Sequence, residues 1–527
     1  MKFLEHAVID ERRRYYLPIQ KILRVEGDIQ NSSQLIGNQE IQMFCGYGGE
    51  RTIIPPNGSI YVDFGMSIHG GVRIIGRAKA GKVNLRFGES VSELLGETNQ
   101  DHSIINTVLA IPYMGMYEFG STVFRFVKLT NLSENELCLV NLIAVALESD
   151  LEATGSFECS DTRLNQIWKT AIRTLHLCLQ DYIYDGSKRD RLIWMGDMHP
   201  ELRGIFCAYS DYSLVKKSFE YKIKDTPLDK PMNGIWTYSC WFIICLYDYY
   251  MASGDKEFLL KHKDYICHVI KQYAEFIAPD GAEIIPDWKF LDWPNEDNPK
   301  AKHAGIQALL IWMLESGAKI FEVFNEDNSY LLTQVELLRK HIPDCDGRKA
   351  PAALQSIIKL ADRRDILENN PYSGVSTFYG FYMLLAKETV PALNLIRKYW
   401  GAMLDYGATT FWEDFDLNWL KNASRIVEFP IEGKDDLHAD FGNYCYKGLR
   451  HSLSHGWSCG PAPFLSERVL GVKFLEPGGS LIEVKPDLGD LEYAKGKIPC
   501  AYGLIEVEAH RNGELKINLP DGVRLKS

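Results

Sequence analysis

The chain has 527 residues, of which 46% are hydrophobic and 24% charged, with a formal net charge of −12 and a pI near 5.6. This length favours two to four domains, and the composition is that of a folded protein rather than a disordered one. The negative charge argues against nucleic acid as a partner, because nucleic-acid binding requires a basic surface.

Residues 1–155 are expected to form an N-terminal β-sandwich. Their strand-like segments are short, rich in β-branched and aromatic residues and bounded by Gly, Asn or Ser, and helical periodicity is absent. These segments lie at 58–65, 70–81, 82–90, 122–132 and 137–147. A sandwich encloses that many strands around one core, and an exposed sandwich face could serve as a homodimer contact.

No export or membrane segment is predicted. The N-terminus has no apolar stretch of signal-peptide length, and the most apolar segment, 240–252, is interrupted by Asp248 and too short to span a bilayer. The twelve cysteines show no CxxC pairs, which indicates reduced, mostly buried thiols. We therefore expect a cytoplasmic protein with no membrane partner.

Residues 156–470 are expected to form an all-α domain. In segment 160–181, Ser or Asp occupies an N-cap position and Leu164, Ile167 and Trp168 begin an apolar helix face. About a dozen such segments follow, among them 213–223, 237–252, 255–277, 303–324, 329–342, 350–367, 375–388, 390–404 and 443–453. Six helical hairpins predict a closed (α/α)6 toroid, although the helix count alone leaves an open solenoid possible.

Residues 471–527 return to β structure. Apolar and polar residues alternate over 480–520, with Gly and Asn at the turns. We expect a small C-terminal β-sheet domain packed on the toroid. The predicted fold class is thus multidomain α and β, in the order β-sandwich, (α/α)6 toroid and β-sheet.

The loops of the helical region are rich in tryptophan and carboxylate, in segments 185–197, 233–238, 285–297, 406–416 and 453–461. A toroid brings such loops together around a central hollow. Indole faces cover the C–H faces of a sugar, and carboxylates accept hydrogen bonds from its hydroxyls. Hydrolysis of a glycosidic bond needs two further carboxyls, one protonated and one ionised, on opposite sides of that bond.

Individual residues also have simpler structural interpretations. Trp168 and Trp241 are expected in the core, His451 as a packing or surface residue, and Asp414 and Asp416 as solvated loop charges. Glu413 alone would be read as a surface or helix-end charge. Only the combination of these loops favours an enzyme.

The stretch at 185–197 resembles the motif of glycoside hydrolase family 78, the inverting α-L-rhamnosidases. The matching residues are Asp185, Arg189, Asp190, Trp194, Gly196 and Asp197, at the family's intervals. Segment 407–413 (GATTFWE) resembles the family's Gly-Ala-Thr-Thr-Ile-Trp-Glu, and 151–168 resembles the entry into its barrel. Shorter resemblances lie at 86–90 (RFGES) and 291–293 (LDW), in the same order along the chain.

The resemblance implies a role for each matched position. It implies that Asp190 is the general acid and Glu413 the general base of an inverting hydrolysis of terminal rhamnosyl groups. The expected substrate-binding residues, including Trp236 from the loop pattern, are Asp185, Arg189, Trp194, Asp197, Trp236, Asp292, Trp293 and His455. No cofactor or metal is predicted, and the expected partner is a small rhamnose-containing oligosaccharide or glycoside.

One departure from the family concerns the acid, which is usually Glu and here is Asp190. The missing methylene shortens the reach of the carboxyl by about 1.5 Å. Either the loop lies closer to the sugar, or a water relays the proton, or the activity is weak. We favour the closer loop, because Arg189, Trp194 and Asp197 are all retained.

Three alternatives remain open at this point. A non-catalytic protein that binds rhamnose or an oligosaccharide would keep the indoles and lose one of the two catalytic carboxyls. Another α/α-barrel enzyme, either a different inverting glycosidase or a polysaccharide lyase, would use other catalytic groups. A helical-repeat scaffold would show a fixed sequence period, and none is visible.

Overall fold

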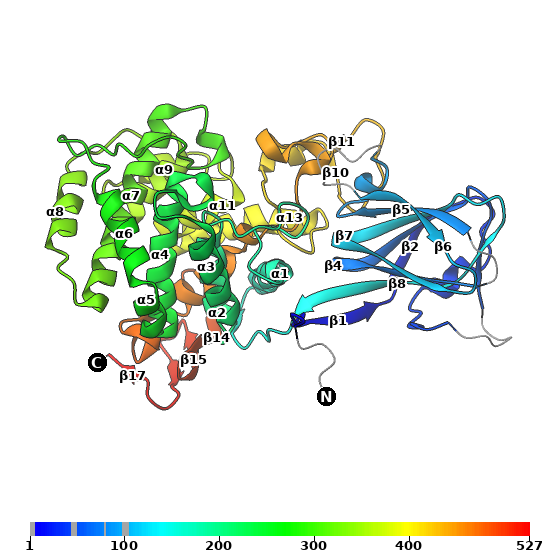
Figure 1. The fold of residues 1–527 in the computed structure, drawn as a ribbon, viewed down its shortest axis with the longest axis horizontal. Helices are drawn as coiled ribbons and strands as arrows, with labels where there is room; N and C mark the ends of the chain where they lie inside the picture. Colours follow the sequence, from blue (N-terminus) through cyan, green and yellow to red (C-terminus); the bar gives the residue numbers. More distant parts are fainter. Residues whose placement is uncertain (1–5, 44–49, 78–80, 97–104, 527) are drawn as a thin grey trace.

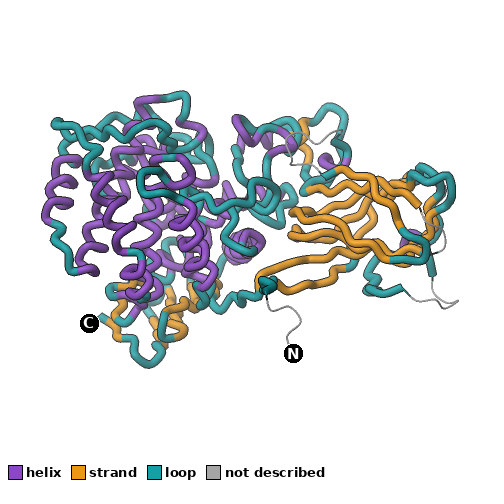
Figure 2. The backbone as a smooth tube through the Cα atoms, viewed as in Figure 1, coloured by secondary structure: helices purple, strands orange, loops and turns teal. Residues whose placement is uncertain are grey.

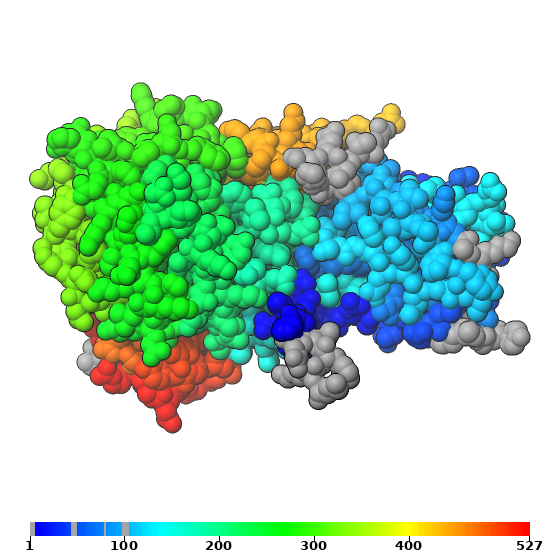
Figure 3. All heavy atoms as spheres, in the orientation of Figure 1, coloured from blue at the N-terminus to red at the C-terminus, as the bar shows by residue number. Residues whose placement is uncertain are grey.

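The computed structural model describes residues 6–43, 50–77, 81–96 and 105–526. A β domain lies at one end of the molecule and a helical body at the other, with the C-terminal strands against one side of the helical body (Figures 1 and 2). The surface between the two ends is continuous, so the molecule is one elongated body (Figure 3).

In its described residues, the N-terminal domain is an antiparallel network of eight strands in the order β1-β8-β4-β7-β5-β6, with β2 paired to β4 and β3 to β8. The strands are β1 (Arg12–Leu17), β2 (Lys21–Glu26), β3 (Thr52–Ile54), β4 (Ser59–Gly76), β5 (Gly81–Gly88), β6 (Asn106–Ile111), β7 (Met116–Asn131) and β8 (Leu137–Ser149). Residues 59–65 and 70–76 of the segments predicted at 58–65 and 70–81 are parts of the single long strand β4, whose pairing with β7 shifts register at two places, and residues 78–80 lie outside the described residues. Its apolar side chains and those of its neighbours form one buried core.

The helical body contains most of the helices predicted from the sequence. They are α1 (Thr162–Cys178), α2 (Met198–Ala208), α3 (Ser213–Asp225), α4 (Trp236–Ser253), α5 (Lys256–Lys261), α6 (Lys263–Ala274), α7 (Pro299–Phe324), α8 (Ser329–Leu338), α9 (Lys349–Ile357), α10 (Arg364–Glu368), α11 (Thr377–Ala386), α12 (Thr389–Leu395), α13 (Gly401–Asp405) and α14 (Pro461–Phe464). The segment predicted at 255–277 divides at His262 into α5 and α6.

Three further differences from the predicted helices occur. Segment 350–367 divides into α9 and α10, with positive φ at Lys359 between them. Segment 443–453 is not an α-helix but contains two short 3-10 turns, Tyr444–Tyr446 and Gly448–Arg450, with positive φ at Tyr444 and Gly448. Helix α2 was not predicted, because its sequence includes both Pro200 and Gly204.

A ring of helix contacts surrounds the centre of the body. Helix α2 packs against α4, α4 against α7, α7 against α9, α9 against α11, α11 against α14 and α14 against α2. Helix α4 is apolar on nearly all sides, as expected for a helix covered by neighbours all round. Helix α7 is long and apolar enough to cross a membrane, but 83% of its most apolar window is buried inside the protein.

The C-terminal residues form two small sheets. The strands are β12 (Val472–Phe474), β13 (Leu481–Val484), β14 (Tyr493–Cys500), β15 (Gly503–His510), β16 (Leu515–Asn518) and β17 (Arg524–Leu525). The first sheet has the order β12-β13-β17, and the second is β16-β15-β14-β9. Strand β9 (Ser156–Cys159) directly precedes α1, so the chain enters the helical body through the C-terminal sheet.

Candidate active site

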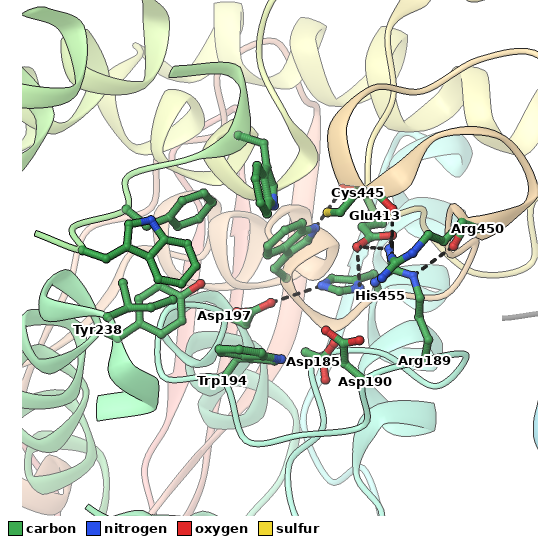
Figure 4. Close-up of a pocket in the computed structure, with 15 residues that line it drawn as sticks. Asp185, Arg189, Asp190, Trp194, Asp197, Tyr238, Glu413, Cys445, Arg450 and His455 are labelled. Carbon is green, nitrogen blue, oxygen red and sulfur yellow. Dashed lines mark hydrogen bonds and ion pairs between the residues drawn. The ribbon is translucent and has the colours of Figure 1, made fainter. Parts of the chain in front are cut away.

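Loops of the helical body surround a cavity of about 220 Å³. Eight sequence-predicted site residues line it, namely Asp185, Arg189, Asp190, Trp194, Asp197, Trp293, Glu413 and His455. The remaining walls are Ile235, Tyr238, Trp288, Phe290, Cys445, Arg450 and Trp457. Figure 4 shows Asp185 and Asp190 beside one another and Glu413 on the far side of His455. The two predicted catalytic carboxyls therefore share one cavity.

The loop that carries Asp190 closes on itself. The backbone N–H of Asp185 donates to the carbonyl oxygen of Leu192 (3.1 Å), and the N–H of Leu192 donates to Asp185 Oδ1 (2.9 Å). Between these residues Asp190 and Arg191 both have positive φ, 55° and 52°. This tight turn leaves Asp190 exposed while Asp185 is buried.

Glu413 is held on all sides. Arg189 Nη2 donates to both carboxylate oxygens (2.6 and 2.5 Å), and the N–H of Ser452 donates to Oε2 (3.1 Å). The backbone of Glu413 is held as well, because its N–H donates to the Ser452 carbonyl and its carbonyl accepts from Trp457 Nε1 and Thr377 Oγ1. The carboxylate thus has one orientation, with Arg189 as its counter-ion.

The carboxyls on the two sides have opposite electrostatic environments. Burial would raise the pKa of Glu413, but the charge of Arg189, with His455 and His451, lowers it to about 2. Burial, and then the nearby Asp197, raise the pKa of Asp185 well above its usual range. Burial also raises the pKa of Asp197, although His455 acts against it. One wall of the cavity therefore holds an ionised carboxylate and the other favours protonated carboxyls.

Aromatic side chains complete the cavity. Trp194 packs edge to face on Tyr238, and Trp457 lies against His455 with ring centroids 4.2 Å apart. His455 Nε2 lies 3.2 Å from Asp197 Oδ1, which links the two carboxyl-bearing walls. A Cβ at Gly196 would approach the Tyr238 ring to 2.5 Å, so this position requires glycine.

Two predicted site residues do not line the cavity. Asp292 is buried, and its Oδ2 accepts from Ser376 Oγ (2.8 Å), so it supports the start of α11 instead of facing the cavity. Trp236 packs against Tyr273 and Phe276 and lines a neighbouring cavity of about 500 Å³. The resemblance predicted Asp292 and the loop pattern predicted Trp236 as site residues, but neither side chain lines this cavity.

Several cavity residues were not predicted. Trp288 and Trp457 lie in the tryptophan-rich loops, so the loop pattern itself indicated them. Tyr238 lies in the first turn of α4 and at the end of the tryptophan-rich segment 233–238, so the loop pattern covered it as well. Cys445 and Arg450 lie in the segment that was predicted as a helix, and that error concealed them.

The simpler structural interpretations are confirmed for Trp168, Trp241 and His451, whereas Glu413 is buried and is not a surface charge. Trp168 and Trp241 are buried in the core, and His451 is a packing residue whose Nε2 accepts from the N–H of Asp414 (2.9 Å). Asp414 is not a freely solvated charge, because burial raises its pKa to about 7. Asp416 is partly buried, and its carboxylate accepts hydrogen bonds from Ser373 Oγ and the N–H of Asn418.

Among the described residues, one group has the geometry of metal ligands. Ligand atoms of Glu89, Glu93 and His438 lie within 4.8 Å of one another. The ammonium of Lys188 lies 3.3 Å from Glu89 and 3.0 Å from Glu93, so a cationic side chain already neutralises this group. It lies outside the cavity.

Comparisons with known proteins identify relatives of this chain. Residues 152–331 match the family described as the bacterial alpha-L-rhamnosidase 6 hairpin glycosidase domain. An alpha-L-rhamnosidase of Formosa agariphila is 20% identical over 451 residues, which are 76% of this chain and 46% of the relative. The chain thus spans about half the length of the curated relative that it matches.

Solved structures share the fold at low sequence identity. A family 78 rhamnosidase of Bacillus sp. GL1 has a TM-score of 0.71 at 20% identity, over 94% of this chain and 56% of that one. A rhamnosidase of Klebsiella oxytoca with rhamnose bound has a TM-score of 0.69 at 21% identity, over 87% of this chain and 96% of that one. These similarities support the multidomain α and β fold.

Proposed function

We propose that this protein hydrolyses terminal α-L-rhamnosyl groups from small rhamnosides. Residues 152–331 match the six-hairpin glycosidase domain of bacterial α-L-rhamnosidases, and the predicted resemblance to glycoside hydrolase family 78 is confirmed. The single observation that supports this most strongly is the shared cavity of Asp190 and Glu413. Its volume, about 220 Å³, lies below the roughly 300–1,000 Å³ typical of drug-sized ligands, which suits one sugar residue.

The proposed reaction is a single displacement. Asp190 donates its proton to the glycosidic oxygen as the bond from that oxygen to the anomeric carbon breaks. Glu413 removes a proton from a water whose oxygen attacks the anomeric carbon from the opposite face, so the configuration inverts. The low pKa of Glu413, about 2, supports this assignment, because a general base must be ionised at the working pH.

The leaving group is proposed to extend past Trp288. This indole is 52% exposed and lines both the candidate site and the neighbouring cavity of about 500 Å³, which also contains Trp236 and Asp287. Replacing Trp288 by Ala should raise KM for a rhamnosyl disaccharide more than KM for p-nitrophenyl α-L-rhamnoside. An equal effect on both substrates would place the leaving group elsewhere.

We also propose that the ring of helices from α2 to α14 is the (α/α)6 toroid. The six successive contacts return to their starting helix, and the matched family is described by six hairpins. An open solenoid would leave α14 unpaired with α2. A crystal structure in which α14 does not pack on α2 would contradict this proposal.

A cytoplasmic location is part of the proposal. The eleven cysteines in the described part of the chain are unpaired, and most are buried. Reduced thiols are typical of the cytoplasm. Recovery of the native protein in the culture medium or periplasm of its host would contradict it.

The test of the proposed function is release of p-nitrophenol from its α-L-rhamnoside by purified protein. Asp190→Asn and Glu413→Gln should each lower kcat by roughly 10²–10⁴-fold while L-rhamnose still binds in calorimetry. NMR of the first-formed anomer should show β-L-rhamnose. A wild-type protein that binds rhamnose without turnover would instead be a sugar-binding protein.

A further inference from the structure

A buried lysine lies between the N-terminal β domain and the candidate site. The side chain of Lys188 is 1% exposed, and its ammonium donates to the backbone carbonyls of Leu449 (2.7 Å) and His451 (3.2 Å). The same ammonium lies 3.0 Å from Glu93 Oε1 and 3.3 Å from Glu89 Oε2. A buried ammonium is stable only with such partners, and its three N–H donors are shared among these four contacts.

Both glutamates belong to the N-terminal domain. Glu89 follows β5 directly, and Glu93 lies in the 3-10 turn Ser92–Leu94. Their side chains are almost fully buried, 1% and 3% exposed. Glu93 Oε2 accepts from the N–H of Glu89 (2.8 Å), which fixes the two carboxylates relative to each other. The β domain thus presents a pair of fixed carboxyl groups to Lys188.

The β domain also contacts the segment that carries the carbonyl partners of Lys188. Glu89 Oε2 accepts from the N–H of Leu453 (3.0 Å). His438 Nε2 donates to the His451 carbonyl (2.9 Å), so its Nδ1 accepts from Ser90 Oγ (2.7 Å). Segment 449–453 is therefore held from one side by the lysine and by the β domain.

The other side of segment 449–453 holds the reacting groups. The carbonyl of Arg450 accepts from Arg189 Nε (3.0 Å), and the N–H of Ser452 donates to Glu413 Oε2 (3.1 Å). Lys188 also directly precedes Arg189 and Asp190 in the sequence. Lys188 does not line the cavity, so any effect on the reaction acts through these neighbours.

We propose that Lys188 is a positioning residue of the reaction, and that Glu89 and Glu93 make the N-terminal domain part of the active-site scaffold. This inference depends on the proposed function for its kinetic test. The lysine fixes segment 449–453, which orients Glu413 and Arg189, and it anchors the loop of Asp190 at its start. Displacement of a catalytic group by about 1 Å can cost roughly 10²-fold in rate, so loss of this anchor should affect turnover.

The experiment compares Lys188→Met with Lys387→Met in the full-length protein. Lys387 is a matched control, because its side chain is 2% exposed and its ammonium donates to Glu368 Oε1 and the Leu367 carbonyl. Lys387 follows the C-terminal end of α11, whereas Thr377, which contacts Glu413, is at the N-terminal end of this helix. In Lys188→Met, kcat should fall by about tenfold to a hundredfold with the Kd for L-rhamnose within about threefold of wild type.

Lys188→Arg, which keeps a cation and its donors, should recover part of kcat, and Lys387→Met should stay within about twofold of wild type. Equal losses in Lys188→Met and Lys387→Met, or an unchanged kcat in Lys188→Met, would overturn the inference. If Lys188→Met does not fold, Glu93→Gln replaces it, because Gln keeps the size of the side chain and one acceptor oxygen. A fall in kcat of Glu93→Gln would then support the inference, and an unchanged kcat would overturn it.

The failure of the proposed function is a separate outcome. If the wild-type protein does not hydrolyse rhamnosides, the proposed function is wrong, and the positioning role is then tested by crystallography. A Lys188→Met structure should lack the contact between the Ser452 N–H and Glu413. An unchanged segment 449–453 would overturn the positioning role whatever the reaction is.

Discussion

Asp190 occupies a backbone conformation that explains its identity. Its φ of 55° and that of Arg191, 52°, lie in the left-handed region, where Asp and Asn are enriched over longer side chains. The sequence showed that Asp replaces the usual Glu but offered no reason for it. The loop geometry supplies one, since Asp fits the turn that ends at Leu192.

Replacing Asp190 by Glu should therefore not improve the enzyme. The longer side chain is less suited to the left-handed turn, and it carries the carboxyl about 1.5 Å farther than the loop is built for. We expect kcat on p-nitrophenyl α-L-rhamnoside to fall, by less than in Asp190→Asn. A Glu variant faster than wild type would show that the loop does not compensate for the shorter acid.

Arg189 controls the ionisation of Glu413. Burial alone would raise the pKa of this carboxyl, and the guanidinium lowers it to about 2, so Glu413 is ionised at every pH above that value. In Arg189→Met the pKa of Glu413 should rise, and the base should be lost by protonation as the pH falls. The acid limb of kcat/KM should then move to higher pH than in wild type.

The matched control for this pH profile is Arg173→Met. Arg173 forms a similar pair with Glu148 outside the cavity, at 2.6 Å. Its replacement should leave the position of the acid limb unchanged. An acid limb that does not move in Arg189→Met would mean that another group sets it.

At the scale of single elements, the start of α1 is the clearest agreement between sequence and structure. The sequence predicted Ser or Asp as the N-cap, and the carboxylate of Asp161 accepts from the N–H groups of Arg163 and Leu164. Asp161 also pairs with Arg397 at 2.7 Å. Capping depends on residues a few positions apart, which is why the sequence alone can predict it.

Asp161→Ala should lower the free energy of unfolding by about 1 kcal/mol, a typical loss for an N-cap. Asp161→Asn keeps a capping oxygen and loses only the charge opposite Arg397, so it should cost less. Urea unfolding followed by circular dichroism measures both, and kcat of the folded protein should not change. Equal losses in the two variants would assign the effect to the ion pair.

Segment 443–453 shows the opposite case. Its apolar spacing predicted a helix, but its backbone groups are used by other parts of the chain. The N–H of Ser452 bonds to Glu413, and the carbonyls of Leu449 and Arg450 bond to Lys188 and Arg189. These partners are distant in sequence, so local periodicity could not indicate them.

At the scale of the whole molecule, the N-terminal domain and the helical body are joined by buried or partly buried charges. Arg125 bonds to Asp63 within the β domain and to the carbonyl of Gly407 in the helical body. Arg173 of α1 bonds to Glu148 and to the carbonyl of Ser67. With Lys188, these contacts make the interface dependent on ionisation.

The interface should therefore respond to pH. Burial, partly offset by Lys188, raises the pKa of Glu89 to about 7, so folding favours its protonated form. The stability from this group is present below its unfolded pKa, near 4.5, and is lost as pH rises through about 7. The Tm of Glu89→Gln minus the Tm of wild type should therefore be larger at pH 8 than at pH 5. A difference in Tm that is the same at both pH values would contradict this.

The sequence by itself determined the order of β, α and β regions, most helices, the capping of α1, and the two motifs that hold Asp190 and Glu413. These follow from side-chain periodicity, turn residues and short spacings, which act within a few residues. Only the tertiary structure decided that Trp288 lines the cavity and Trp236 does not. It also decided that Arg189 lowers the pKa of Glu413 and that Lys188 bonds to the β domain. The bond between Arg189 and Glu413 joins residues 224 positions apart, and such contacts depend on how the whole chain packs.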